Sequence, residues 1–268
     1  MDVFYINLDR ADDRRAFMEA QGRARGVRLQ RLRATEPKDL GPGEYERFAD
    51  AWERKLTLNE IALLRSHAAL WRMALDRPEG LVVLEDDAVL SPRFARVIER
   101  LPAGYDLINL EDFGRAKFFA RNADQSDADF RLTRVIRDKT GSAAYHVSPS
   151  GAAKLLKRME TTAAPSDAFL FAVARLNMAQ VEPALARQAH ILTEHGFDPG
   201  ITIATSICKA RIGAPKERKR PIFAARRVAT QVRLAGLHLR RPFDVVLRPV
   251  AFDDAEFRAI LPIRVDQA

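Results

Sequence analysis

Apolar residues recur along this chain with two different spacings, which predicts an alternation of strands and helices. Short apolar runs with the length of buried strands occur at residues 3–6, 81–84, 106–110 and 143–147. Helical spacing, with polar N-cap signals at Thr57 and Ser148, predicts helices at about residues 11–25, 57–77, 91–101 and 148–159. Strands that alternate with helices indicate an α/β layered fold.

Two stretches depart from this alternation. Residues 114–138 are charged and weakly periodic, which predicts a mobile loop or a hairpin that could serve as a lid. From about residue 214 the composition becomes basic, with a Lys/Arg cluster at 216–220 and arginines mixed with apolar residues at 222–241. We therefore expect a main domain at 1–207 and a basic, largely helical extension at 208–268. A helix there could lie on an anionic membrane or pack back on the domain, and the sequence favours neither.

Composition limits the class of protein. With 268 residues, 47% of them hydrophobic, the chain can bury a substantial core. The sequence has no apolar run of about 18 residues and no signal-peptide pattern, so we expect a cytoplasmic protein. A single cysteine excludes an intrachain disulfide. The net charge of +8 favours phosphate-bearing partners without saying which kind.

The most informative stretch is Leu81–Asp87, which reads Leu-Val-Val-Leu-Glu-Asp-Asp. In open α/β sheets, ligands bind beyond the carboxyl ends of the strands, and the three acids fall at that position. Adjacent carboxylates repel one another and favour a counter-cation, and hard oxygen ligands select Mg²⁺ or Mn²⁺. A solvated acidic turn that caps the next element explains the heptapeptide equally well.

Several blocks of sequence together resemble glycosyltransferase family 25, the bacterial lipopolysaccharide-type glycosyltransferases. The blocks lie at residues 3–10 with Arg14 and Arg15, 56–61 with Ser66, His67 and Trp71, 83–87, 141–156 and 165–167. The likeness spans about residues 1–207. One block departs from the family, whose helix usually reads Gly-Glu-Ile-Gly-Cys where this chain has Asn-Glu-Ile-Ala-Leu at 59–63.

The resemblance implies a GT-A type, Rossmann-like nucleotide-sugar fold. It also implies a UDP-sugar donor, often UDP-galactose, and inverting transfer to a saccharide acceptor, which we expect to belong to a cell-surface glycolipid. Mn²⁺ or Mg²⁺ would bridge the donor diphosphate, with Asp87 as the first candidate ligand. The donor-binding candidates are Asn7, Leu8, Arg10, Arg14, Glu60, Ser66, His67, Glu85 and Asp86.

Some of these candidates have simpler explanations. Arg10 and Arg14 share one face near a helix start, where phosphate is favoured, but they could equally pair with neighbouring aspartates. Glu60 belongs to the capping box of its helix. For His67, a structural hydrogen bond at the edge of the core is the plain alternative to a role in the donor site.

Inverting transfer needs a base for the acceptor hydroxyl. Asp167, before an apolar run, is our first candidate and Asp112 the reserve, although Asp167 could be only an N-cap. His195 could complete a metal shell, but a lone loop histidine is usually unliganded.

Other functions remain in competition. A metal-dependent nucleotidyltransferase or a non-catalytic sugar-nucleotide-binding protein would use a similar sheet. A nucleic-acid-binding module is disfavoured because no aromatic residues are interleaved with the basic cluster. We therefore expect no nucleic-acid partner.

Overall fold

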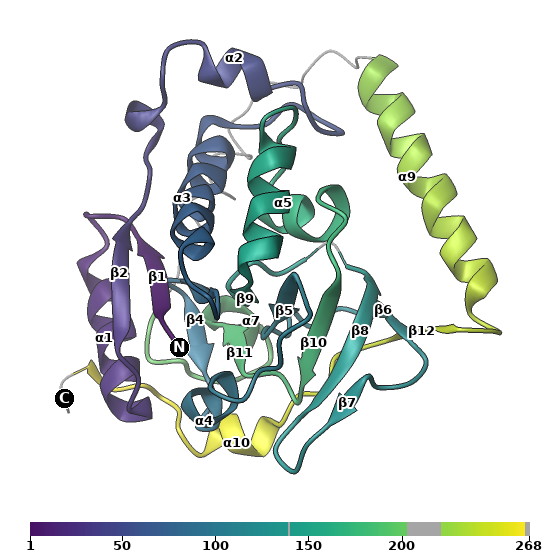
Figure 1. Cartoon of the computed structure of the whole chain (residues 1–268). Coiled ribbons are helices and arrows are strands. Elements are labelled where there is room, and N and C mark those ends of the chain that lie inside the picture. Colours follow the sequence, from purple (N-terminus) through teal and green to yellow (C-terminus); the bar gives the residue numbers. More distant parts are fainter. Residues whose placement is uncertain (139, 203–220, 266–268) are drawn as a thin grey trace.

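The computed structural model describes residues 1–138, 140–202 and 221–265 and contains a large mixed sheet flanked by helices (Figure 1). The strand order is β12-β6-β8-β10-β5-β9-β3-β1-β2, with β7 paired to β8, while β4 and β11 form a separate pair. The strands are β1 (Val3–Asn7), β2 (Leu29–Arg33), β3 (Leu81–Glu85), β4 (Ala88–Leu90), β5 (Leu107–Asn109), β6 (Lys117–Ala120), β7 (Gln125–Ser126), β8 (Arg131–Arg137), β9 (Ala144–Val147), β10 (Met178–Glu182), β11 (Ala186–Gln188) and β12 (Val245–Arg248).

Helices connect most of these strands. They are α1 (Asp12–Arg25), α2 (Glu44–Phe48), α3 (Leu58–Leu75), α4 (Phe94–Ile98), α5 (Pro149–Met159), α6 (Ser166–Ala168), α7 (Ala189–Glu194), α9 (Pro221–Arg240) and α10 (Asp254–Arg258), with a 3₁₀ turn η1 (Pro37–Asp39) and a π-helical turn η2 (Phe169–Val173). The predicted caps are confirmed. Thr57 and Glu60 form a reciprocal capping box at α3, and the Ser148 side chain accepts a hydrogen bond from the Gly151 N–H at α5.

The apolar runs are continuous because the sheet is buried on both faces. Along β1 and β3, alternate residues point to opposite sides. Phe4 and Val83 join a core layer with α3 and α5, whereas Tyr5 and Val82 join a second layer with α1, α4 and α10. The predicted α/β layered fold is therefore confirmed.

The parallel part of the sheet positions the acidic motif. β1 pairs in parallel with both β2 and β3, so the carboxyl ends of these strands meet at one edge. β9 runs antiparallel between β3 and β5, and β10 pairs in parallel with β5. The parallel pairings of β1 with β2 and β3, and of β5 with β10, are consistent with a Rossmann-like fold.

Two predicted segments differ in detail. Residues 117–137 form β6, β7 and β8. Since β6 and β8 pair antiparallel and extend the sheet, the predicted hairpin is confirmed and the alternative, a mobile loop, is not. The helix expected at 91–101 is shorter. The three residues before Ser91 form β4, which pairs with β11, and α4 spans only Phe94–Ile98. A strand of three residues is too short to leave a periodic signal.

The C-terminal part returns to the sheet. β12 pairs antiparallel with β6, and the Glu256 carboxylate of α10 accepts hydrogen bonds from Arg93 next to α4. The long helix α9 precedes β12 in the chain and lies at the right edge of the molecule in Figure 1. The basic cluster at 216–220 and the boundary expected at 207/208 lie outside the described residues, so the division into two domains stays a prediction.

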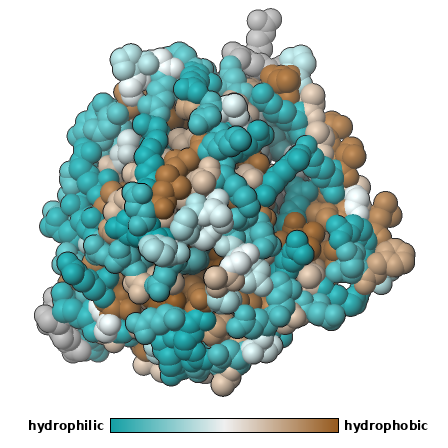
Figure 2. Space-filling view, in the orientation of Figure 1, coloured by the Kyte–Doolittle hydropathy of each residue, from teal (hydrophilic) through white to brown (hydrophobic). Residues whose placement is uncertain are grey.

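Among the described residues, helix α9 contacts the rest of the protein along one side. Phe223 is buried, and Arg226 donates hydrogen bonds to the backbone carbonyls of Asp50 and Trp52. The other side exposes Val228, Val232 and Leu239, and Figure 2 shows apolar side chains at the right edge, where α9 lies. Within the described ranges, no helix combines the length and the apolar character needed to cross a membrane.

Candidate functional site

A cleft with a volume of about 300 Å³ opens at the carboxyl ends of β1 and β3. Seven of the residues predicted from the sequence line it: Leu8, Arg10, Arg14, Ser66, Glu85, Asp86 and Asp87. They come from three places, namely the β1–α1 turn with the first turn of α1, the first half of α3, and the end of β3 with the two residues after it. The parallel pairing of β1 with β3 brings the first and last of these together.

Asp86 is held by two donors. The Asn7 side-chain amide donates to Oδ2 at 2.8 Å, and Arg14 Nη1 donates to Oδ1 at 3.0 Å. Burial raises the pKa of Asp86 above its ordinary value even though Arg14 and Asn7 oppose this shift. Asn7 thus lies behind the cleft and fixes an acid, while Arg14 contacts that acid and also lines the open space.

Glu85 is tied to the interior. Ser142 Oγ donates to Glu85 Oε1 at 2.6 Å, and His67 Nε2 lies 3.4 Å from the same oxygen, without the alignment of a hydrogen bond. Burial alone would raise the pKa of Glu85, but His67 and Ser142 outweigh it and the pKa falls. Glu85 therefore carries a stable negative charge in the cleft.

Asp87 is the least satisfied of the three acids. Its Oδ1 is buried and has no hydrogen-bond partner among the described residues. Burial, followed by the charges of Glu85 and Asp86, raises the pKa of Asp87 to about 8. A buried carboxyl group beside two other acids is costly to ionise, so this position favours either a proton or a cation.

The side chains of the cleft provide only some of the ligands that a hard divalent cation needs. Within the described ranges, no three His, Cys, Asp or Glu side chains converge closely enough to enclose a metal ion. Asp87 offers one unpartnered oxygen, and Mg²⁺ commonly binds through one or two carboxylates together with substrate phosphates. The residues thus fit a cation that is completed by a substrate, and not a closed structural metal site.

Behind Glu85 runs a buried polar chain. His67 Nδ1 and the Tyr145 hydroxyl are 2.9 Å apart, and Trp71 Nε1 donates to the same hydroxyl at 2.9 Å. The rings of His67 and Tyr145 stack with centroids 5.8 Å apart. All three side chains are fully buried. His67 therefore supports Glu85 from behind and does not line the cleft.

Replacing Tyr145 with phenylalanine is expected to lower the free energy of unfolding by about 1–3 kcal/mol, because both nitrogens that contact its hydroxyl would be left buried and unpaired. Tyr105→Phe is the matched control, since its hydroxyl donates to Asp124 at an exposed position. Urea denaturation measures both variants. Equal, small losses in the two variants would show that the buried chain contributes little.

Other predicted donor residues have structural partners. Glu60 binds the Arg54 guanidinium with both oxygens, at 2.9 and 2.6 Å, and caps α3, so it does not reach the cleft. Ser66 lines the cleft while its Oγ accepts a hydrogen bond from the Thr35 N–H. Arg10 also lines the cleft, with an exposed side chain paired to Glu36.

The residues predicted as base and as second metal ligand are not among those that line the cleft. Asp112 forms a buried ion pair with Arg187. Asp167 lies at the start of α6, next to Ser166, whose Oγ is 2.9 Å from Ser142 Oγ and hence one step from Glu85. His195 ends α7, where its Nδ1 contacts the Ile191 carbonyl.

The structure adds side chains that the sequence did not suggest. Phe113, Gln188 and His190 line the cleft, and His190 Nδ1 is buried without a hydrogen-bond partner among the described residues. Gln188 donates to buried Glu111, and burial raises the pKa of Glu111 to about 8. Residues 106–112 are a second strand-like run that ends in acids, and this pattern could have pointed to Glu111. No sequence pattern pointed to 188–190.

Comparisons with known proteins agree on one family. Residues 1–170 match the model of glycosyltransferase family 25, which is described as LPS biosynthesis protein. A glycosyltransferase 25 family member of Drosophila pseudoobscura pseudoobscura is 31% identical over 131 residues, which cover 43% of this chain and 20% of the relative. The Drosophila melanogaster family member is 30% identical over 131 residues, covering 43% of this chain and 21% of the relative.

A mammalian relative has a more specific name. Procollagen galactosyltransferase 2 of Mus musculus is 28% identical over 120 residues, covering 41% of this chain and 19% of the relative. The chain thus spans about a fifth of the length of the curated relatives that it matches.

Proposed function

Because this chain belongs to glycosyltransferase family 25, we propose that it transfers a hexose from a UDP-sugar to a saccharide acceptor. The observation that carries the proposal is the cleft at the ends of β1 and β3, in which two arginines face three acids. Galactose is the first candidate sugar, since one relative is named as a galactosyltransferase. Transfer with inversion at the anomeric carbon is part of the proposal.

Arg10 and Arg14 would bind the donor diphosphate. Both line the cleft, and Arg10 is exposed and paired with Glu36. A guanidinium group matches two phosphate oxygens with parallel hydrogen bonds. Arg14 keeps its contact with Asp86, which orients it toward the open space.

Asp87 would hold Mn²⁺ or Mg²⁺ together with the diphosphate. When bound, the cation would neutralise charge that develops on the leaving phosphate oxygen. The support for this role is the unpartnered Oδ1 of Asp87 in a cleft that also contains the charged Glu85. His190 is an additional ligand candidate, ahead of His195, because it lines the same cleft and its Nδ1 has no hydrogen-bond partner among the described residues.

Asp167 remains the first candidate for the base that takes the proton of the acceptor hydroxyl, with Asp112 second. Asp167 follows Ser166, which Ser142 connects to Glu85, whereas the carboxylate of Asp112 is engaged by Arg187. An Asp167→Asn variant that transfers sugar at the wild-type rate would exclude this assignment.

The acceptor would belong to a glycolipid of the lipopolysaccharide type, as the description of the family suggests. Contact with an anionic membrane, at the inner face of the cytoplasmic membrane, would bring the enzyme to such an acceptor. The apolar and arginine residues exposed on α9 support this location. If purified protein failed to sediment with anionic vesicles, membrane contact would be excluded.

Slow hydrolysis of a panel of UDP-, GDP- and CMP-sugars tests the proposed donor. We expect the protein with Mn²⁺ to release UDP from one UDP-hexose, and a chelator to stop the release, because the cation stabilises the leaving group. Release that survives chelation would refute the metal while keeping the donor. No release from any donor, together with no heat of UDP binding, would overturn the proposal.

A further inference from the structure

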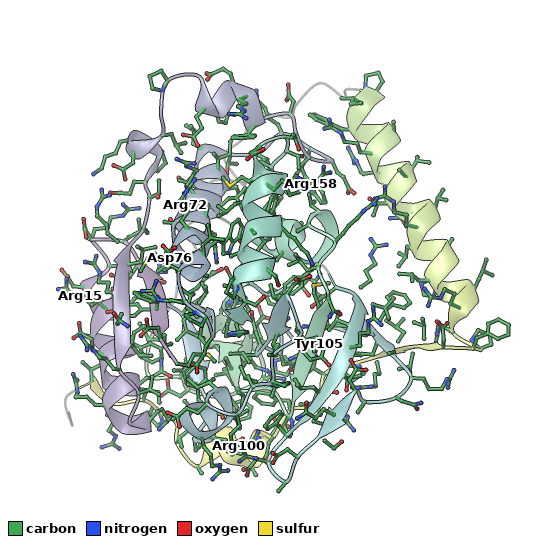
Figure 3. All side chains as sticks on the ribbon, in the orientation of Figure 1. Arg15, Arg72, Asp76, Arg100, Tyr105 and Arg158 are labelled. Carbon is green, nitrogen blue, oxygen red and sulfur yellow. The ribbon has the colours of Figure 1, made fainter. Side chains whose placement is uncertain are left out.

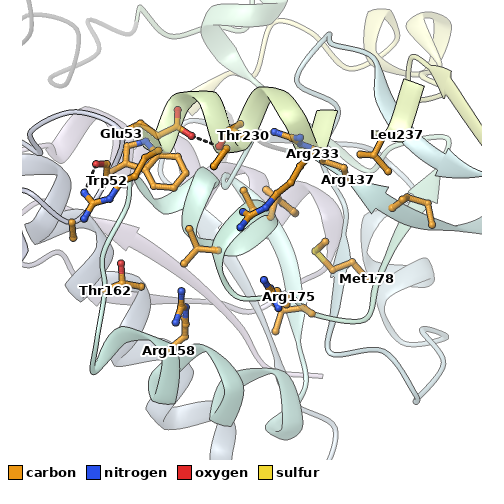
Figure 4. Close-up of a pocket in the computed structure, with 18 of the residues that line it drawn as sticks. Trp52, Glu53, Arg137, Arg158, Thr162, Arg175, Met178, Thr230, Arg233 and Leu237 are labelled. Carbon is orange, nitrogen blue, oxygen red and sulfur yellow. Dashed lines mark hydrogen bonds between the residues drawn. The ribbon is translucent and has the colours of Figure 1, made fainter. Parts of the chain in front are cut away.

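A second concave surface lies between α9 and the rest of the protein (Figure 4). We call it the arginine groove, and its volume is about 890 Å³. The charged residues that line it are Arg137, Arg158, Arg175, Arg226, Arg233 and Glu53. It shares no lining residue with the cleft described above.

The arginines reach this groove from four separate parts of the chain. Arg137 ends β8, Arg158 belongs to α5, and Arg175 follows η2, while Arg226 and Arg233 belong to α9. Figure 3 places Arg158 between α5 and α9, and Figure 4 shows Arg158, Arg175 and Arg233 extending into the space between them. Convergence from several elements distinguishes this cluster from the charged face of a single helix.

Among the described residues, most of this positive charge has no neutralising partner. Arg226 is used to hold α9, through the backbone carbonyls of Asp50 and Trp52. Across the parts of the chain that the structure describes, the guanidinium groups of Arg158, Arg175 and Arg233 form no hydrogen bond or ion pair.

Arg137 also lies close to another positive charge of the groove. Burial lowers its pKa, and the charge of Arg233 lowers it further, while Glu53 opposes the shift. Glu53 is the one acid among the described residues that line the groove, and its carboxylate also accepts a hydrogen bond from the Thr230 hydroxyl. One carboxylate thus faces five guanidinium groups.

Like charges held together repel by about 1 kcal/mol per pair at 4 Å even in water, so such a cluster gains from a bound anion. Guanidinium groups bind phosphate oxygens in pairs, which makes phosphate the matching anion. Apolar walls from Trp52, Met178 and Leu237 leave room for an uncharged part of the ligand. We propose that the arginine groove binds a ligand that carries two or more phosphate groups.

Two sources could supply that chemistry, a soluble phosphorylated saccharide or the phosphorylated headgroup of a lipid. The soluble probe is myo-inositol hexakisphosphate, titrated into the full-length protein by calorimetry. The lipid probe is sedimentation with vesicles of phosphatidylcholine and cardiolipin, a lipid that carries two phosphate groups. Both probes are applied to the wild type and to two double variants.

The groove variant is Arg175→Gln with Arg233→Gln. The matched control is Arg227→Gln with Arg241→Gln, which removes the same charge from residues at α9 that do not line the groove. All four arginines are exposed, so both variants should keep the thermal midpoint of the wild type.

We expect the groove variant to bind the soluble probe about tenfold more weakly, while the control loses about twofold through general electrostatics. If the wild type and the control bind the vesicles but not the soluble probe, and the groove variant binds neither, the result supports the same site with a lipid headgroup as the ligand. Equal losses in the two double variants, or no binding of either probe by the wild type, would overturn the proposal. None of these outcomes depends on whether the protein hydrolyses a nucleotide sugar.

Discussion

Replacing Asp87 with asparagine should remove metal-dependent UDP binding and, at the same time, stabilise the metal-free protein. The loss in donor hydrolysis should be on the order of 100-fold or more, because Asp87 has the unpartnered oxygen that would hold the cation. The gain in stability follows from the same geometry. The variant replaces a buried carboxyl group crowded by Glu85 and Asp86 with a neutral amide of nearly the same shape.

The gain in stability should depend on pH in a defined direction. The pKa of Asp87 rises from 3.8 to about 8 on folding, so its favourable contribution is fully present below pH 3.8 and is lost as the pH rises toward 8. The thermal midpoint of Asp87→Asn should therefore exceed that of the wild type increasingly between pH 4 and pH 8, in chelator.

Asp76→Asn is the control, because Asp76 caps the exposed end of α3 away from the cleft. It should bind UDP with Mn²⁺ as the wild type does. If Asp87→Asn kept metal-dependent binding, the assignment of Asp87 would fail. If the variant lost both binding and stability, Asp87 would be a structural residue.

The largest loss of stability is expected for Gly80→Ala, at the turn before β3. Gly80 has φ +68°, and a Cβ there would lie 2.0 Å from the Val147 carbonyl oxygen and 2.9 Å from the Ser148 Cα. Both contacts are with backbone at the junction of β9 and α5, so neither can move away cheaply. Backbone strain and overpacking together should cost about 3–5 kcal/mol.

Gly26→Ala separates these two causes. Gly26 ends α1 with φ +63°, but an added Cβ would meet nothing within 4 Å. It should lose only about 1–2 kcal/mol, the cost of the left-handed backbone. Chemical denaturation measures both variants, and equal losses would show that the approach of Gly80 to Val147 is not a constraint.

Much of the fold could be predicted because its strands are buried on both faces and its main helices begin with clear caps. Thr57 and Ser148 are examples in which a local hydrogen bond fixes the boundary. Strands β4 and β11 could not be predicted, since they are three residues long and exist through their pairing with each other. The extension of the sheet by β12 likewise depends on a partner, β6, that is distant in sequence.

The candidate site was predictable where chemistry is concentrated in sequence. Glu85, Asp86 and Asp87 are adjacent and end a buried strand, so their position followed from the pattern. His190 could not be found in this way, because it reaches the cleft through the docking of α7, which no local motif specifies. The sequence pointed instead to His195, five residues further along the chain.

The pairing of β12 with β6 affects how the sheet can form during synthesis of the chain. As the chain leaves the ribosome, β6 emerges long before β12, so its outer edge stays without a neighbour while the intervening segment is made. An open edge of this kind can pair with another chain. A polypeptide cut short before residue 245 would keep that edge open permanently and would be prone to self-association, even with every residue of the cleft in place.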